Sequence, residues 1–178
     1  TGINMVILAD TREWQHPLRF PIEGAVTAVE TMTLSVGDYS CRYTDGRVSP
    51  IVFERKSLSD LFGTMGKGYP RFRRELVRAR QAEVTLILIV EGTLSDCYTG
   101  IPYSSQQGNS LVQKLFTLWV RYGLQPVFCT NRQEMVCYML ELWEAIGRET
   151  VRGGREVSRD GELAERPSKT QLKESHAG

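Results

Sequence analysis

The stretch that most constrains this chain is Phe-Glu-Arg-Lys at residues 53–56. Side chains alternate along a strand with a period of two, so Glu54 and Lys56 point to the same face of a sheet. Asp38 lies at the start of the preceding extended stretch, and Asp45-Gly46 between the two stretches is a typical hairpin signal. We therefore expect the chain to fold back and place Asp38 beside Glu54.

Two carboxylates next to an ammonium group suit a phosphodiesterase that depends on Mg²⁺. In this interpretation Asp38 and Glu54 hold the metal, and Lys56 orients or deprotonates the attacking water. Taken alone, the three residues leave a second interpretation open, which is a hairpin with alternating charges on its solvent face.

The neighbouring sequence narrows that choice. It reads GDYS at residues 37–40 and FERKSLSDL at 53–61, with ADTRE at 9–13 upstream and RFRREL at 71–76 and IVEG at 89–92 downstream. This pattern resembles the nuclease domain of the XPF-type structure-specific endonucleases, also found in archaeal Hef. Their signature is GD, a variable spacer and ERKxxxD, which residues 54–60 match without a gap. The resemblance covers residues 5 to about 146.

The resemblance implies an α/β domain of the restriction-endonuclease-like type, with a central mixed sheet flanked by helices. It also implies a DNA endonuclease that requires Mg²⁺ or Mn²⁺ and acts at branched or single/double-strand junctions in repair or recombination. The expected catalytic residues are Asp38, Glu54, Arg55 and Lys56, with Arg55 or a basic helix residue stabilising charge on the phosphate. The alternative is a non-catalytic DNA-binding or scaffolding subunit, because some members of the family have lost the carboxylates. The intact Asp38, Glu54 and Lys56 argue against that alternative.

Asp10 follows the apolar run at residues 5–9, at the carboxyl end of a predicted buried strand, where α/β sheets tend to place ligand groups. Its position alone is equally compatible with capping the next turn. The DxRE pattern of the resembling family favours Asp10 as a third metal ligand beside Asp38 and Glu54. Arg12 and Glu13 fit the same pattern as supporting residues, although an Arg–Glu pair that structures the turn is an equal alternative.

Two further acids are expected to support the site. Asp60 stands three residues after Ser57, a capping-box-like spacing at the start of a helix, and it matches the last position of the signature. Glu91 ends the apolar strand at residues 84–90, as Asp10 ends its own strand.

Residues 71–81 predict a helix with a basic face. Arg71, Arg74 and Arg78 recur at three and four residues, Lys67 precedes them, and Glu75 is the one acid in the stretch. Like charges at this spacing repel, so an anionic partner such as DNA explains them better than a solvated face, which remains the alternative.

Length and composition limit the possible domain organisation and the possible site chemistry. We expect one domain over residues 1–147 and a flexible polar tail over residues 148–178. A net charge of +1 gives no global basic bias, and two histidines and four cysteines without CxxC spacing argue against a zinc site or a Ser-His-Asp triad. The four cysteines also lack the density of a disulfide scaffold, so we expect an intracellular protein. The longest apolar run is too short to span a membrane, so we expect a soluble one.

The sequence leaves the structural role of two segments undecided. Residues 93–109 read as a long loop that is either functional or disordered. The predicted helix at residues 132–146 is apolar on more than one face, which fits either core packing or a dimer. Because the tail has no room for the duplex-gripping module of the family, we expect a homodimer or a second DNA-binding subunit. The expected contact surface is residues 118–122 and 136–143.

Overall fold

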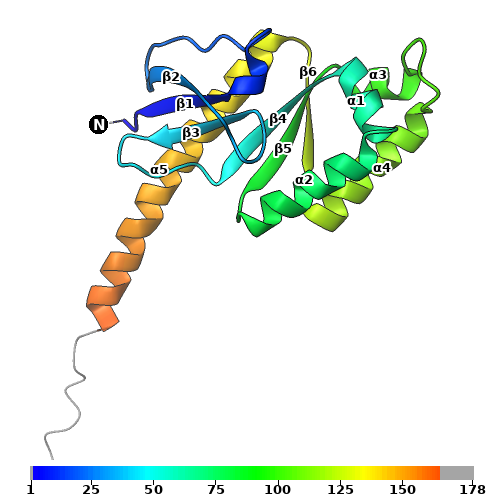
Figure 1. Cartoon of the computed structure of the whole chain (residues 1–178). Helices are drawn as coiled ribbons and strands as arrows, with labels where there is room; N and C mark the ends of the chain where they lie inside the picture. Colours follow the sequence, from blue (N-terminus) through cyan, green and yellow to red (C-terminus); the bar gives the residue numbers. More distant parts are fainter. Residues whose placement is uncertain (1, 165–178) are drawn as a thin grey trace, which may run out of the picture.

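A mixed β-sheet with helices on both faces forms the core of the computed structural model, which describes residues 2–164 (Figure 1). The strands are β1 (Met5–Asp10), β2 (Val26–Met32), β3 (Tyr39–Tyr43), β4 (Ile51–Ser57), β5 (Thr85–Glu91) and β6 (Gln125–Cys129). A short 3₁₀ turn, η1 (Thr11–Glu13), follows β1, and the helices are α1 (Leu58–Met65), α2 (Tyr69–Gln81), α3 (Leu94–Thr99), α4 (Gly108–Tyr122) and α5 (Arg132–Ala164). The fold class expected from the sequence is confirmed.

The strand order across the described sheet is β2-β1-β3-β4-β5-β6. β3 runs antiparallel to both β1 and β4, whereas β4, β5 and β6 run parallel to one another. The predicted hairpin is therefore present, and the backbone turn that follows Tyr43 closes it with a hydrogen bond from Gly46 to Tyr43. Because the hairpin occupies the middle of the sheet, the helices pack against both of its faces.

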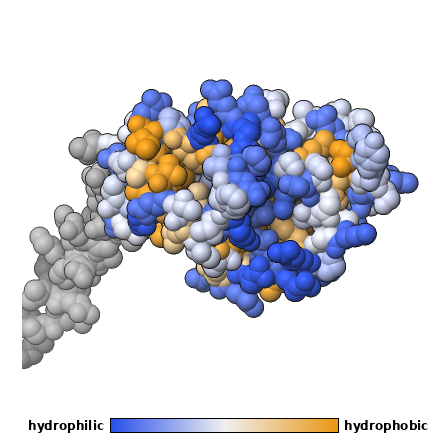
Figure 2. All heavy atoms as spheres, turned by 45° about the horizontal axis from the view of Figure 1, so that its top comes forward, coloured by the Kyte–Doolittle hydropathy of each residue, from blue (hydrophilic) through white to orange (hydrophobic). Residues whose placement is uncertain are grey.

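Separate hydrophobic cores fill the two faces. On one face α5 packs its Met135, Met139 and Trp143 against the sheet, and the Trp143 indole N–H donates to the Ile51 carbonyl at 3.1 Å. On the other face α1, α2 and α4 cover β4 and β5. The outer surface is mixed: Figure 2 shows hydrophilic side chains over the middle and lower edge of one face, with apolar side chains towards either end.

This packing corrects part of the expected dimer surface. Leu118 and Trp143 are fully buried and Val136 is 6% exposed, so these side chains belong to the core. The apolar residues of α4 that remain exposed are Phe116, Trp119 and Val120.

Two further expectations differ from the structure. Residues 93–109 contain α3, whose start is fixed by a capping box in which Thr93 and Asp96 exchange side-chain and backbone hydrogen bonds. The helix expected to end near residue 146 runs on to Ala164, so the expected boundary at 147 falls inside α5. Gly147 lets the helix pass Tyr43 closely, since a Cβ there would lie 2.8 Å from the tyrosine ring. Residues 165–178 of the expected tail lie outside the described residues.

Among residues 2–164, no helix combines the length and the apolar character needed to cross a membrane.

Candidate active site

The Gly37-Asp38 dipeptide is held between β1 and β4. The Asp38 N–H donates to the Phe53 carbonyl at 2.8 Å, and the Asp10 N–H donates to the Asp38 carbonyl at 2.8 Å. Gly37 has φ +74°, and a Cβ at that position would lie 2.4 Å from the Val52 side chain. Only glycine fits this close approach, which fixes Asp38 beside the strand that carries Glu54 and Lys56.

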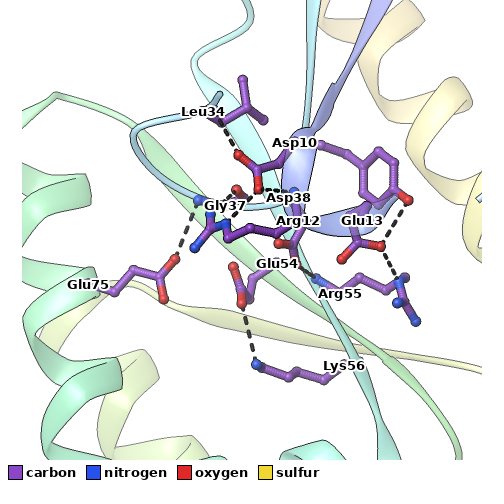
Figure 3. A network of polar contacts seen from close by, with 11 residues as sticks. Asp10, Arg12, Glu13, Leu34, Gly37, Asp38, Glu54, Arg55, Lys56 and Glu75 are labelled. Atoms are coloured by element: carbon purple, nitrogen blue, oxygen red, sulfur yellow. Dashed lines mark hydrogen bonds and ion pairs between the residues drawn. The ribbon is translucent and has the colours of Figure 1, made fainter. Parts of the chain in front are cut away.

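A cavity of about 450 Å³ opens beside this dipeptide, between the strand ends and the helices α1 and α2. Nine of the residues that line it carry charged side chains: Arg12, Glu13, Asp38, Glu54, Arg55, Lys56, Asp60, Arg71 and Glu75. The residues proposed as catalytic from the sequence therefore share one cavity, and Figure 3 shows their side chains around it.

Glu54 is the most poorly satisfied charge in the cavity. It is 7% exposed, its Oε2 atom is buried without a hydrogen-bond partner among the described residues, and its Oε1 atom lies 3.5 Å from the Lys56 Nζ atom. Burial and the neighbouring carboxylates of Asp38 and Glu75 raise the pKa of Glu54 well above its ordinary value.

Asp38 is in a similar environment. Burial raises its pKa to about 6, the charge of Glu13 adds to the rise, and a hydrogen bond from the Arg55 N–H opposes it. The fold thus holds two carboxylates together although neither is well compensated by the protein. Such a pair is stabilised by any cation placed between its oxygens.

A relay of contacts positions Arg55. Its Nε atom donates to Glu13 at 2.9 Å, the Tyr39 hydroxyl donates to the same carboxylate at 3.0 Å, and the Leu18 N–H donates to that hydroxyl at 2.8 Å. Glu13 therefore contacts the cavity residue Arg55, and its supporting role in the site stays a prediction.

Asp10 has a different role from the one expected. Its carboxylate accepts hydrogen bonds from the Arg12 N–H at 2.9 Å, the Arg12 side chain at 2.5 Å and the Leu34 N–H at 2.8 Å, and it does not line the cavity. Burial acts to raise the pKa of Asp10, but these hydrogen bonds outweigh it and hold the pKa below its ordinary value. Asp10 orients Arg12, which is the residue that reaches the cavity (Figure 3).

The other expected residues divide between the cavity and its surroundings. Asp60 lines the cavity, and its N–H donates to the N-cap Ser57 at 3.1 Å as the spacing predicts. Glu91 ends β5 in register with Ser57 and does not line the cavity. Of the basic residues, Arg71 lines the cavity, Arg74 lines a separate hollow with Tyr122, and Lys67 and Arg78 are exposed elsewhere.

Glu75 is the site residue that the sequence interpretation missed. It lies on α2, lines the cavity, accepts a hydrogen bond from the Gly37 N–H at 3.4 Å and contributes to the raised pKa of Glu54. A signal for it existed, because an acid three residues after the buried Phe72 and four after Arg71 lies next to the inward side of the helix.

The cavity offers only a few oxygen ligands for a hard cation. Among the described residues, no group of three or more His, Cys, Asp or Glu side chains converges in a way that could hold a metal ion. Mg²⁺, however, keeps several waters and commonly takes only one or two carboxylates plus substrate phosphate. Asp38 and Glu54, with the unpartnered Oε2 atom of Glu54, fit that smaller requirement.

Comparison with known proteins agrees with this geometry. The family model described as ERCC4 domain matches residues 9–142, so the chain belongs to this family. The resemblance to the XPF-type nucleases is thereby confirmed.

Solved structures show the same fold. XPF from Aeropyrum pernix in complex with DNA is similar to this chain with a TM-score of 0.60 and 21% identity over 83% of this chain and 66% of that one. XPF from Aeropyrum pernix, in a second structure, gives a TM-score of 0.60 and 22% identity over 86% and 69% of the two chains. This chain thus spans about two thirds of the solved chains. A search of curated proteins finds no match.

Proposed function

We propose that this chain is a DNA endonuclease that depends on Mg²⁺ or Mn²⁺ and hydrolyses phosphodiester bonds. The observation that carries the proposal is the buried, crowded pair Asp38 and Glu54 with Lys56 at its edge. A purely structural role would favour neutral or fully paired side chains at these positions, because an uncompensated buried charge destabilises the fold.

Four cavity residues have a direct role in this proposal: Asp38, Glu54, Arg55 and Lys56. Asp38 and Glu54 hold the metal, which when bound supplies positive charge to the scissile phosphate. Lys56 lies close enough to Glu54 to orient the attacking water or take its proton. Arg55, held by Glu13, stabilises negative charge on the phosphate as it develops.

The substrate is proposed to be branched or junction-containing DNA, in repair or recombination. The similar XPF structure from Aeropyrum pernix is a complex with DNA. In this chain the basic residues of α2 and the preceding loop provide phosphate contacts, with Arg71 at the cavity and Lys67, Arg74 and Arg78 outside it.

A second subunit belongs to the same proposal. A domain of this size contacts few phosphates, so a homodimer or a separate DNA-binding subunit enlarges the contact area. Sedimentation of the protein with and without forked DNA tests the homodimer. A monomer at high micromolar concentration in both samples eliminates it.

A panel of labelled forks, flaps, bubbles, duplexes and single strands tests the activity itself. We expect wild-type protein to cut at least one branched substrate with Mg²⁺ and none with EDTA. Glu54→Ala should bind the same DNA as well as wild type, or more tightly, because it removes negative charge near phosphates. Cleavage at the wild-type rate by Glu54→Ala would show that the metal site is wrongly assigned. DNA binding without cleavage by wild type would favour the non-catalytic subunit instead.

A further inference from the structure

Helix α2 presents different chemistry on its two long sides. Arg71 and Glu75 face the cavity described above. Tyr69, Arg73 and Arg80 lie on another side, because at 3.6 residues per turn their directions fall within about 40° of one another and roughly 120° to 180° from those of Arg71 and Glu75. We call Tyr69, Arg73 and Arg80, together with Lys114 and Tyr122 of α4, the tyrosine–arginine stripe.

Cations and aromatic rings alternate along this stripe. The Lys114 Nζ atom lies 5.3 Å and the Arg73 Cζ atom 5.9 Å from the centre of the Tyr69 ring. Arg73 also donates to the Tyr122 hydroxyl at 3.5 Å, and the Arg80 Cζ atom lies 5.4 Å from the Tyr122 ring centre. The cations therefore fix the orientation of both rings, and a base that stacks on either ring would share it with a cation.

The positive charge of the stripe is not neutralised by the protein. In the part of the chain that the structure describes, no ion pair joins Arg73, Arg80 or Lys114 to an Asp or Glu. The hydrogen bond from Arg73 holds the pKa of Tyr122 below its ordinary value, which reflects the positive surroundings of the ring. An anionic ligand is the natural complement to such a surface.

Tyr122 also separates two hollows in the surface. One, of about 280 Å³, is lined by Pro70, Arg73, Arg74, Val77 and Tyr122. The other, of about 310 Å³, includes Arg80, Thr85 and Gly123 beside the same tyrosine, and one acid, Glu83, also lines it. Each hollow combines an aromatic ring, a guanidinium and apolar atoms, and Val77 remains 42% exposed in the first one. A planar group with a neighbouring phosphate matches this combination.

We propose that the tyrosine–arginine stripe binds single-stranded nucleic acid, with bases against Tyr69 and Tyr122 and phosphates against Arg73 and Arg80. A duplex hides its base faces in the stack, so it gains only the phosphate contacts here. The stripe from residue 69 to residue 80 is about 16 Å long at 1.5 Å per residue, enough for on the order of five nucleotides at 3.4 Å each. The identity of the nucleic acid as DNA rests on the proposed function.

The test measures binding without cleavage. Fluorescence anisotropy of a labelled 12-nucleotide oligo-dT, in EDTA, gives Kd for each variant at several salt concentrations. Tyr122→Ala should weaken binding about tenfold, within the range for one lost base stack, whereas Tyr122→Phe keeps the ring and should stay within about twofold of wild type. Arg73→Gln should weaken binding and reduce the salt slope by about 0.7.

Arg19→Gln is the matched control for charge. Arg19 is exposed between Leu18 and Phe20, which belong to the core under α5, so the same loss of charge there should leave oligo-dT binding near wild type. Thermal unfolding of each variant reports folding. If Tyr122→Ala is unfolded, Arg73→Gln tests the proposal instead, because Arg73 is exposed and its substitution should not disturb folding.

The proposal is overturned if folded Tyr122→Ala binds like wild type, if Tyr122→Phe is as weak as Tyr122→Ala, or if Arg73→Gln and Arg19→Gln behave alike. A parallel titration with a 12-base-pair duplex should show little change in Tyr122→Ala, and an equal loss there would assign the tyrosine to duplex contact instead. Binding of oligo-dT through Tyr122 by a protein that cuts no DNA removes the endonuclease proposal and leaves the stripe. If wild type cleaves a junction but folded Tyr122→Ala binds oligo-dT as well as wild type does, the stripe proposal is removed and the endonuclease proposal stands.

Discussion

Asp10 and Glu54 are two buried carboxylates near the middle of the same sheet, and they differ in how the protein satisfies them. Asp10 is 1% exposed and accepts hydrogen bonds from Arg12 and from the Leu34 N–H, which keep its pKa low. Glu54 is 7% exposed, has the Oε2 atom without a partner among the described residues, and has Asp38 and Glu75 beside it, which raise its pKa. The protein therefore satisfies the Asp10 carboxylate with hydrogen bonds, whereas it leaves the Glu54 carboxylate partly unpaired and beside other negative charges.

The difference separates a structural acid from an acid available for chemistry. A buried charge that is fully hydrogen-bonded stabilises the turn around it, whereas a crowded and unpaired one persists only because the surrounding packing holds it there. Perturbed carboxylates of the second kind gather at functional sites. The contrast places Asp10 in the architecture of the η1 turn and supports the proposal that Glu54, with Asp38, takes part in the reaction.

The largest expected effect is on cleavage. Asp38→Asn keeps the size of the side chain and removes one of the two carboxylates proposed to hold the metal, so we expect the rate to fall about a thousandfold or more. Asp10→Asn, corrected for its folded fraction, should stay within about tenfold of wild type, because Asp10 acts only through Arg12. Rates are compared on the best substrate of the DNA panel. Similar losses in both variants would place Asp10 in the reaction after all.

The second effect is on folding stability, where we expect the substitution of Asp10 to cost most. Asp10→Ala leaves the N–H groups of Arg12 and Leu34 without their acceptor, so we expect a loss of about 2 to 3 kcal/mol in the free energy of unfolding. The Arg12 side chain contributes little to this loss because it is 61% exposed. Urea unfolding measures the change. A loss below about 0.5 kcal/mol, the usual range for surface substitutions, would contradict the structural role.

Sequence reasoning found the local part of this contrast. The period-two alternation that places Glu54 with Lys56, the Asp45-Gly46 turn and the Ser57 cap are set by neighbours in the chain, and the structure contains all of them. Asp10 and Glu54 could not be distinguished in the same way. The hydrogen bond from Leu34 to Asp10 crosses 24 residues of chain, and nothing in the residues next to Asp10 indicates it.

The local sequence did not reveal the position of Glu75 in the site or the full length of α5, and the two misses have related reasons. Glu75 reaches the site because α2 packs against the Gly37 turn, a tertiary contact between residues 38 positions apart. The polar composition after residue 147 resembles a tail, yet Gly147 allows the helix to pass Tyr43 and continue. In both cases the deciding contact is long-range, so local periodicity carries too little information to reveal it.

A third prediction concerns stability and pH. The pKa of Asp38 is raised from 3.8 to about 6, so the folded protein holds this proton more tightly than the unfolded chain does. The contribution of Asp38 to stability is therefore greatest below about pH 4 and is lost as pH rises towards 6. Asp38→Asn removes that loss and should be more stable than metal-free wild type at pH 7.5 by about 3 kcal/mol, with the difference shrinking towards pH 4. Urea unfolding across this pH range in EDTA checks it. A difference independent of pH would mean that the carboxylate is not strained.

The smallest effect tests whether Glu75 contributes to the strain on Glu54. Glu75→Gln removes one negative neighbour and keeps an oxygen that can accept the Gly37 N–H, so the pKa of Glu54 should fall while the turn stays in place. The acid limb of the pH–rate profile should then move to lower pH, and the plateau rate at high pH should stay within about threefold of wild type. Glu141→Gln, at an exposed position on α5, removes the same charge away from the cavity and should leave the profile unchanged. An acid limb that stays in place in Glu75→Gln, or moves to higher pH, would show that the electrostatic contrast between Glu54 and Asp10 arises from burial and Asp38 alone.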